Sequence, residues 1–285
     1  MTRIAYLGPE GTNSHEALLA AAATAGPGAA GHELASLGTI YDCVIAVQEG
    51  AAERAFVPIE NALEGSVNAT LDALAVETED IEIVGEHVHA IHTCLIAKRP
   101  RELSAIETVI SHPQANAQCA HFLRTRLPQA TVLAASSTAE AVRQVAERDD
   151  ASAALGSRTA AELYDCAVLC ADVDDAAGNE TRFVWLARRG DGGSAAASGP
   201  YKTAIVFWGV GAEAPGWLVR CLSEFAFRGV NLTRIESRPR KQGLGRYMFF
   251  ADLEGGVSEE PVAGALEALR AHVEHLRVLG SFPAA

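Results

Sequence analysis

The sequence predicts two domains: an α/β domain with a parallel-type sheet, then a smaller α+β domain with the ferredoxin-like βαββαβ order. Before residue 188, short runs of Val, Ile and Ala alternate with helical patterns, which indicates parallel strands with helices on both faces of the sheet. After residue 201 the order is strand, helix, strand, strand, helix, strand, which is the ferredoxin-like order. The stretch between them, "RRGDGGSAAASGPYK", is rich in Gly, Ser and Ala and predicts a linker.

Composition limits the class of protein and its partners. A length of 285 residues suits about two domains. The 36 acidic residues outnumber the 23 basic ones and leave a net charge of −13, which argues against nucleic acid or an anionic membrane surface as a partner. The start, "MTRIAYLGPEG", has too short an apolar stretch for a signal peptide, and the Ala-rich stretch 17–25 is too short to span a membrane. We therefore expect a cytoplasmic protein.

Strands and helices are expected to alternate in the first domain, with a last strand at 179–188. Each expected strand is a short apolar run, and a helical pattern follows it. The pairs are 3–8 with 14–25, 54–59 with 66–74, 107–111 with 112–127, and 131–137 with 138–147. Ser137, with Glu140 three residues on, predicts an N-terminal cap for the helix at 138–147.

The second domain also has clear residue signals for where its first helix starts and ends. Its first helix, 215–229, has Pro215 in the first turn and Gly229 as the terminating residue. The apolar residues of this helix follow one another at intervals of four and three residues along the chain. The elements expected in this domain are 202–210, 215–229, 230–239, 245–255, 260–273 and 275–282.

Three strand-to-helix junctions of the first domain, 8–16, 58–70 and 110–119, share one composition. Each places Ser or Thr where a helix begins, and the free N–H groups and dipole of a helix N-terminus can hold a carboxylate or phosphate without a lysine. Ligands of open α/β sheets bind outside the carboxyl ends of the strands, where these junctions would lie. The alternative is simple helix capping by the serines at these starts, Ser14, Ser66 and Ser111.

No metal or cofactor is expected. His87, His89 and His92 include an i, i+2 pair on one strand face, but no further ligand is spaced to complete a metal site, so we expect them to pack. The sequence lacks a GxGxxG fingerprint, a P-loop and a Gly-x-Ser-x-Gly elbow. Its six cysteines form no CxxC pair, which favours reduced and mostly buried thiols.

Several motifs together carry a family resemblance. They are "YLGPEGTNSHEA", "PIENALEGSVNATLDAL", "SHPQANAQC", "NETRFVWLA", "GVNLTRIESRP" and "YMFFADLEG", in this order along almost the whole chain. In them the chain resembles prephenate dehydratases that carry a C-terminal ACT regulatory domain. The resemblance implies a carbon–oxygen lyase of phenylalanine biosynthesis, which converts prephenate to phenylpyruvate with loss of water and carbon dioxide and needs no cofactor.

The resemblance implies that Thr181 of "NETRF" is the catalytic residue, acting on the departing oxygen. The product is aromatic, so the elimination is downhill, and the main requirement is a positioned donor at the leaving group. A carboxylic acid there would, once ionised, repel the dianionic substrate. A threonine hydroxyl is a weak acid, so full proton transfer and hydrogen bonding both stay open. Without the resemblance, Thr181 would be read as an ordinary β-branched strand residue.

The implied substrate site consists of polar junction residues and one aromatic ring. Its members are Glu60, Asn61, Ser111, Gln118 and Phe183, with Thr12 and Thr70 as further candidate donors. We expect the two amides and the Ser111 hydroxyl to bind the substrate's carboxylates or hydroxyl, and Phe183 to form an apolar wall against the ring. Arg182 alternates to the opposite strand face from Thr181, so we expect it to support the fold or pair with an acid.

The family fold is a two-lobed α/β domain similar to type II periplasmic binding proteins, with the site between the lobes. We expect a catalytic domain at 1–189, with one lobe at about 1–78 and 179–189 and the other at about 79–178. A linker at 190–201 and an ACT domain at 202–285 would follow.

ACT domains pair and bind amino acids where they meet. The resemblance therefore implies feedback regulation by phenylalanine or another aromatic amino acid, and a homotetramer built as a dimer of dimers. The expected effector-binding residues are Gly216, Trp217, Leu218, Asn231, Leu232, Glu236, Ser237, Arg238 and Pro239. Members of the family usually have the sequence Gly-Ala-Leu here, and in this chain Trp217 takes the place of the alanine. Its indole could fill part of the effector pocket or stack on the ligand.

Two other functions compete with this hypothesis. Arogenate dehydratases perform the same elimination on a substrate with an amino group, and the sequence does not separate the two decisively. A non-catalytic amino-acid sensor is the alternative from another class. The presence of Thr181 together with Asn61, Ser111 and Gln118 argues against a sensor, because sensing needs no donor at a leaving group.

Overall fold

The computed structural model describes residues 2–24, 32–191, 199–209, 211 and 214–285. The chain forms two compact units. Unit 1 comprises Met1–Thr70 and His87–Phe183, and unit 2 comprises Leu71–Glu86 and Val184–Ala285. The middle of the predicted linker, residues 192–198, lies outside the described residues.

The first sheet has the strand order β2-β1-β3-β11-β5, with β4 paired to β3. β1 runs parallel to both β2 and β3, as the alternating pattern predicts. The strands of this sheet and the helices between them are β1 Arg3–Leu7, α1 Asn13–Thr24, β2 Glu33–Leu37, α2 Ile40–Gln48, β3 Arg54–Asn61, β4 Gly65–Ser66, α3 Asn68–Asp72, the π-helical turn η1 Ala73–Glu77, β5 Ile81–Ala90 and β11 Glu180–Arg188.

The second sheet, in unit 1, has the order β10-β6-β9-β7-β8. β7 runs parallel to β8 and β9, while β6 runs antiparallel to β9 and β10. The predicted parallel sheet is therefore correct for one side of this mixed sheet and wrong for the other. Its elements are β6 Cys94–Ala97, η2 Leu103–Ala105, β7 Thr108–Ser111, α4 Pro113–Gln118, α5 Ala120–Arg126, β8 Thr131–Ala134, α6 Thr138–Glu147, β9 Ser152–Gly156, α7 Arg158–Leu163 and β10 Ala167–Cys170.

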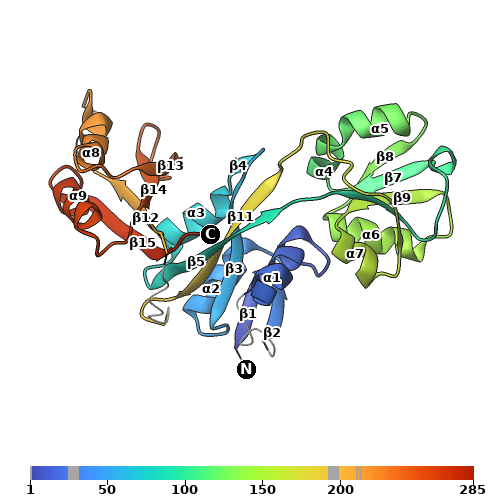
Figure 1. Cartoon of the computed structure of the whole chain (residues 1–285), viewed down its shortest axis with the longest axis horizontal. Coiled ribbons are helices and arrows are strands. Elements are labelled where there is room, and N and C mark those ends of the chain that lie inside the picture. Colours follow the sequence, from blue (N-terminus) through green and yellow to red (C-terminus); the bar gives the residue numbers. More distant parts are fainter. Residues whose placement is uncertain (1, 25–31, 192–198, 210, 212–213) are drawn as a thin grey trace. The chain divides into compact units, whose positions relative to one another are not determined.

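Helices cover both faces of this second sheet (Figure 1). On one face, Cys119 and Leu123 pack with Val109 and Leu155. On the other, α6 and α7 bury Val142, Val145 and Ala160 against Ile96 and Ile110. Because two separate apolar cores hold the sheet, the loops at its strand ends are set on a rigid base.

The predicted helix at 112–127 is wrong in one respect, because it breaks at Cys119 into α4 and α5. The break is held by Asp175. Its backbone N–H donates to Gln118 O at 2.8 Å, and its carboxylate accepts from the N–H groups of His121 and Phe122 at 2.7 and 3.1 Å. These bonds satisfy both new helix ends, and they fix Gln118 as the last residue of α4.

The predicted helix at 66–74 also starts later than expected. Ser66 belongs to β4, where it lies opposite Glu60 of β3 in an antiparallel pair. Gly65 turns the chain there with a positive φ of 81°, a conformation that favours glycine. The helix α3 therefore begins only at Asn68.

The C-terminal part of unit 2 is an antiparallel sheet with the order β13-β14-β12-β15 and two helices on one face (Figure 1). Its elements are β12 Tyr201–Trp208, α8 Trp217–Ala226, β13 Leu232–Pro239, β14 Tyr247–Glu254, α9 Glu260–Arg270 and β15 His275–Pro283. This confirms the predicted βαββαβ order. The predicted place of Pro215 in the first helical turn is wrong, since α8 begins after Gly216, whose φ is +77°.

The core of this part of the chain lies between its helices and the sheet. Trp217, Cys221 and Phe225 of α8 pack with Leu266 and Leu269 of α9. None of the helices in the described part of the chain is long and apolar enough to cross a lipid bilayer.

Candidate active site

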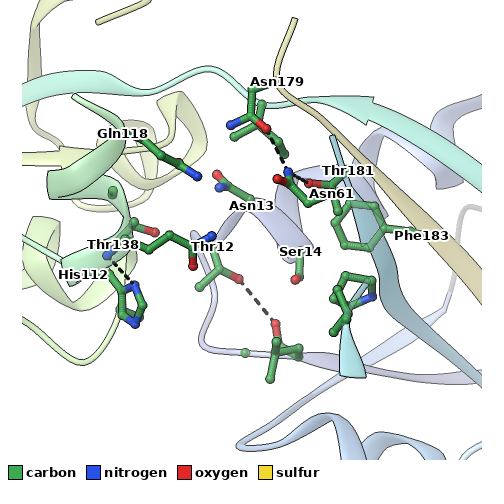
Figure 2. A pocket seen from close by; sticks show the side chains of 18 of the residues that line it. Thr12, Asn13, Ser14, Asn61, His112, Gln118, Thr138, Asn179, Thr181 and Phe183 are labelled. Atoms are coloured by element: carbon green, nitrogen blue, oxygen red, sulfur yellow. Dashed lines mark hydrogen bonds between the residues drawn. The ribbon is translucent and has the colours of Figure 1, made fainter. Parts of the chain in front are cut away.

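A cavity of about 400 Å³ lies in unit 1 among loops that follow strands of both sheets. Leu7 ends β1 and Gly8 follows it, Asn61 ends β3, and His112 follows β7. This is the carboxyl end of parallel strands, where open α/β sheets bind ligands. Figure 2 shows the polar side chains of these loops pointing into the cavity. Its volume suits a small molecule.

The wall of the cavity is polar but carries almost no formal charge. All of its lining residues are described, and they include no Asp, Glu, Lys or Arg. Neutral polar side chains line it instead: Thr12, Asn13, Ser14, Gln114, Gln118, Ser136, Ser137 and Thr138. Such a wall can hold an anion without repelling it.

Two helices point their N-termini at the cavity. α1 starts at Asn13 and α6 starts at Thr138, and both residues line the cavity. The first backbone N–H groups of a helix have no partner within it, and the helix dipole adds positive potential at that end. The Ser137 hydroxyl accepts from Glu140 N at 3.0 Å and so fixes the start of α6. Helix N-termini of this kind are suited to binding anions.

Thr181 and Asn61 form the best-defined polar contact of the cavity. Thr181, on β11, is 9% exposed, and its Oγ1 lies 2.9 Å from Asn61 Nδ2. The amide of Asn61 cannot be reversed, because its Oδ1 accepts from the backbone N–H groups of Leu63 and Glu64, both at 3.0 Å. Asn61 Nδ2 therefore donates and Thr181 Oγ1 accepts.

This direction of donation decides what Thr181 can do. Its oxygen already accepts from Asn61, and its hydroxyl hydrogen has no acceptor among the described residues. The hydrogen is therefore free to donate to a ligand in the cavity, which Thr181 lines (Figure 2). Phe183, two residues on along the same strand face, is buried, and its ring stacks on Phe56 with centroids 4.9 Å apart. A donor therefore lies beside an apolar surface that suits a ring.

The comparisons with known proteins agree with this geometry. The prephenate dehydratase family model matches residues 4–191, and the prephenate dehydratase of Amycolatopsis methanolica is 41% identical over 282 residues, covering 99% of this chain and 88% of its own. The chain belongs to the prephenate dehydratase family.

Solved structures support the same assignment. The crystal structure of the Arthrobacter aurescens prephenate dehydratase in complex with L-Phe is 36% identical, with a TM-score of 0.87, and the match covers 99% of this chain and 90% of that one. A structure described as a novel type of quorum quenching acylase is 29% identical, with a TM-score of 0.84. This match covers 99% of this chain and 98% of that one. As a member of the prephenate dehydratase family, the chain is a hydro-lyase of phenylalanine biosynthesis, as the sequence predicts.

The structure brings five of the predicted site residues of this prephenate dehydratase family member together around the cavity. They are Thr12, Asn61, Gln118, Thr181 and Phe183. Gln118 Nε2 also donates to Glu64 Oε1 at 3.2 Å, and the Thr12 hydroxyl donates to Pro9 O at 2.9 Å.

Three other predicted residues do not line the cavity, because their side chains serve the fold. The Ser111 hydroxyl is fully buried and donates to Leu155 O at 2.7 Å. The Thr70 hydroxyl is also buried and donates to Pro58 O at 2.5 Å. Glu60 Oε2 lies 3.2 Å from Arg182 Nε, so Arg182 pairs with an acid as expected.

Several lining residues were not named individually as site residues, although Asn13, Ser14, His112 and Gln114 belong to the predicted junctions 8–16 and 110–119. They are Asn13, Ser14, His112, Gln114, Ser136, Ser137, Thr138 and Asn179. Ser137 was expected only to cap a helix, although the same residue can cap α6 and line the cavity. The signal that would have indicated this junction is its place after β8, a strand parallel to β7, which brings both junctions to one sheet edge.

The predicted effector residues do not share one face of the C-terminal sheet. Ser237 lies opposite Phe249, which packs on Trp217 beneath the helices. Side chains alternate along a strand, so Glu236 and Arg238 lie on the face away from the helices. Trp217 is buried, and its indole N–H donates to His272 O at 2.8 Å, so the indole fills the core of this part of the chain.

Arg238 is bound within unit 2. Its guanidinium makes two contacts with the Asp72 carboxylate, at 2.9 and 3.2 Å, and Lys241 adds a third at 3.0 Å. Burial by itself would raise the pKa of Asp72, but the hydrogen bonds from Arg238 and Lys241 outweigh it and hold that pKa below its usual value. The ionised form of Asp72 is thus the one that stabilises unit 2.

Replacing Asp72 with asparagine is expected to lower the stability of the protein by about 1–3 kcal/mol near pH 7. Because the pKa of Asp72 is lowered on folding, its contribution is present above the unfolded value of about 3.9 and is lost as the pH falls through the lower folded value. The difference in melting temperature between wild type and Asp72→Asn should therefore shrink below about pH 4. Thermal unfolding followed by circular dichroism across this pH range measures it.

Asp149→Asn is the matched control for Asp72→Asn. Asp149 also pairs with a lysine, Lys98, but its side chain is 86% exposed, so solvent screens the pair and its loss should cost much less stability than the loss of Asp72. Equal losses of stability in the two variants would show that the Asp72 contact stabilises the protein no more than the exposed Asp149 pair does.

Proposed function

We propose that this protein converts prephenate to phenylpyruvate in the cytoplasm, by decarboxylating dehydration in the cavity of unit 1. The observation that carries the proposal is the direction of the Asn61–Thr181 hydrogen bond, which leaves a hydroxyl hydrogen free on the cavity side. Prephenate carries two carboxylates, a ring and a leaving hydroxyl. The cavity offers two helix N-termini, an aromatic surface and one held hydroxyl donor.

The two carboxylates would bind at the N-termini of α1 and α6. Each terminus supplies unpaired N–H groups, and serines and threonines add hydroxyl donors beside them. Since these donors are neutral, the site does not need lysine or arginine. In a protein with a net charge of −13, binding then depends on these local groups and not on the overall field.

The reaction needs no covalent intermediate. The bond from the ring to its carboxylate breaks, its electron pair becomes a ring double bond, and the ring C–O bond breaks on the other side. The products are carbon dioxide, phenylpyruvate and hydroxide, and the hydroxide takes a proton to leave as water. The Thr181 hydroxyl stabilises the charge that develops on the departing oxygen, which is an effect typically worth about 10² to 10⁴-fold.

The composition of the cavity favours prephenate over arogenate. Arogenate carries an ammonium group, and a buried ammonium needs a carboxylate or several acceptors nearby. The lining has no Asp or Glu. A simple sensor is disfavoured because the held Thr181 donor has no use without a leaving group.

Purified protein incubated with prephenate or with arogenate tests this proposal, with phenylpyruvate or phenylalanine followed as the product. We expect turnover of prephenate and a much lower kcat/KM for arogenate. Turnover of arogenate alone would overturn the substrate assignment, and folded protein that turns over neither would overturn the enzymatic function.

We also propose the domain plan and regulation that the family suggests. In this plan 1–189 forms the catalytic domain, with lobes at about 1–78 with 179–189 and at 79–178, 190–201 the linker and 202–285 the regulatory domain. The protein forms a dimer of dimers, and phenylalanine binds the regulatory domain and lowers activity. The support is the L-Phe complex of the Arthrobacter aurescens relative and the βαββαβ order of 202–285.

Phenylalanine is expected to lower the rate of wild-type protein and to alter it less in Trp217→Ala. The indole packs against the rings of Phe207 and Phe249, so its removal leaves a cavity in the core of the C-terminal part of the chain and costs about 3–5 kcal/mol of stability. Phenylalanine titration by calorimetry, with the initial rate measured in parallel, tests both parts. An unchanged affinity of Trp217→Ala for phenylalanine would show that Trp217 is not part of the effector site.

A further inference from the structure

Asn179 lines the cavity immediately before β11, two residues ahead of Thr181. It is 4% exposed, and its backbone C=O accepts from Ile91 N at 2.8 Å, which holds the main chain there. A buried carboxamide has one acceptor and two donor hydrogens to satisfy. The orientation of the Asn179 carboxamide therefore indicates which groups it binds.

The neighbours of Asn179 fix that orientation. Leu63 N and Glu64 N hold Asn61 Oδ1, so Asn61 Nδ2 is the group that faces Asn179. The Asn179 atom that lies 2.8 Å from this donor must then be its acceptor, Oδ1. Asn179 Nδ2 is left on the cavity side (Figure 2), and it has no hydrogen-bond partner among the described residues.

We propose that Asn179 has two tasks in the reaction: Oδ1 positions the Thr181 donor through Asn61, and Nδ2 binds an acceptor oxygen of the substrate. This inference rests on the proposed function and extends it to a residue outside the predicted site. Asn179 is a positioning residue through its oxygen and a substrate-binding residue through its nitrogen.

The positioning task follows from the geometry of an amide. Asn61 Nδ2 carries two hydrogens in one plane, set about 120° apart. One is taken by Asn179 Oδ1 at 2.8 Å, which directs the other to Thr181 Oγ1 at 2.9 Å and Glu180 O at 3.2 Å. Without Asn179 Oδ1 the first hydrogen is unpaired in a buried place, and the amide can tilt away from Thr181. A small misplacement of a catalytic group can cost about 10²-fold in rate.

The binding task follows from the free donor. A buried N–H group that faces a cavity without a protein acceptor is satisfied by water or by a ligand oxygen. The wall around it has no fixed charge, so a neutral donor there selects an acceptor-rich, anionic ligand. A carboxylate placed at the same position would repel that ligand.

The two tasks separate in a pair of variants. Asn179→Asp keeps the acceptor toward Asn61 but presents a carboxylate to the cavity, so KM for prephenate should rise about tenfold or more while kcat stays within about threefold of wild type. Asn179→Ala loses the acceptor, so kcat should fall about 10- to 100-fold. Asn116→Ala, which removes a part-buried amide of the same unit outside the cavity lining, serves as the control and should leave both constants unchanged.

A double variant tests whether Asn179 acts through Asn61. If it does, kcat of Asn61→Ala/Asn179→Ala should lie within about threefold of Asn61→Ala alone, because the second change removes a support that is already lost. Losses that multiply would overturn the positioning task, and an unchanged KM in Asn179→Asp would overturn the binding task. Wild type without prephenate turnover would overturn the proposed function itself, and this inference with it.

Discussion

Thr181→Ala is expected to lower kcat for prephenate by about 10² to 10⁴-fold, the range for loss of one general-acid or hydrogen-bond donor. The physical reason is the free hydroxyl hydrogen, which Asn61 directs toward the cavity by occupying the Thr181 oxygen at 2.9 Å. KM should change little, because the interaction strengthens only as charge develops on the leaving oxygen. Steady-state formation of phenylpyruvate, followed by ultraviolet absorbance, gives both constants.

Two variants control for the shape and the fold in this experiment. Thr181→Ser keeps the hydroxyl and should retain activity within about tenfold of wild type, with the remaining loss due to a freer χ1 rotamer. Thr125→Ala removes an exposed hydroxyl on α5 that donates to His121 O and should have no effect. A Thr181→Ala enzyme as active as wild type would remove Thr181 from the mechanism.

Asn61→Asp is expected to lower kcat almost as far as Thr181→Ala, although the two side chains have nearly the same shape. The retained oxygen can still accept from Leu63 N and Glu64 N. The new oxygen in place of Nδ2 can no longer donate to Thr181. The Thr181 hydroxyl then turns and donates to this carboxylate, which removes its hydrogen from the cavity. A loss of about 10² to 10⁴-fold in kcat follows from the same range as before.

The added charge of Asn61→Asp needs its own control. Asn68→Asp makes the same chemical change at an exposed position at the start of α3, outside the cavity lining. It should leave kcat unchanged. If Asn61→Asp kept wild-type kcat, the direction of the hydrogen bond between Asn61 and Thr181 would not matter for the reaction.

The local elements of this fold could be read from the sequence because local rules decide them. The helix at 138–147 and its Ser137 cap have the predicted bounds, and the βαββαβ order of the C-terminal part was visible from its periodicity. The break of 112–127 at Cys119 was not predictable in this way. It depends on Asp175, which lies more than fifty residues along the chain and reaches both helix ends only in the folded protein.

The candidate site shows the same division between local and long-range information. Asn179, Thr181 and Phe183 alternate along one strand start and all line the cavity, as a period of two predicts. Ser111 has a suitable residue type and position, but its hydroxyl donates to Leu155 O and so cannot donate to a ligand. The pairing of β7 with its neighbours makes that contact, and no motif in the sequence records it.

The most direct test is a single-turnover measurement of prephenate conversion by excess enzyme, comparing wild type with Thr181→Val. Valine keeps the branched shape of threonine but has no hydroxyl, so the comparison isolates the donor, and excess enzyme isolates the chemical step from product release. We expect the observed rate to fall by at least about 10²-fold in Thr181→Val, with bound substrate still detected. A single-turnover rate equal to that of wild type would contradict the claim that the Thr181 hydroxyl assists the leaving group.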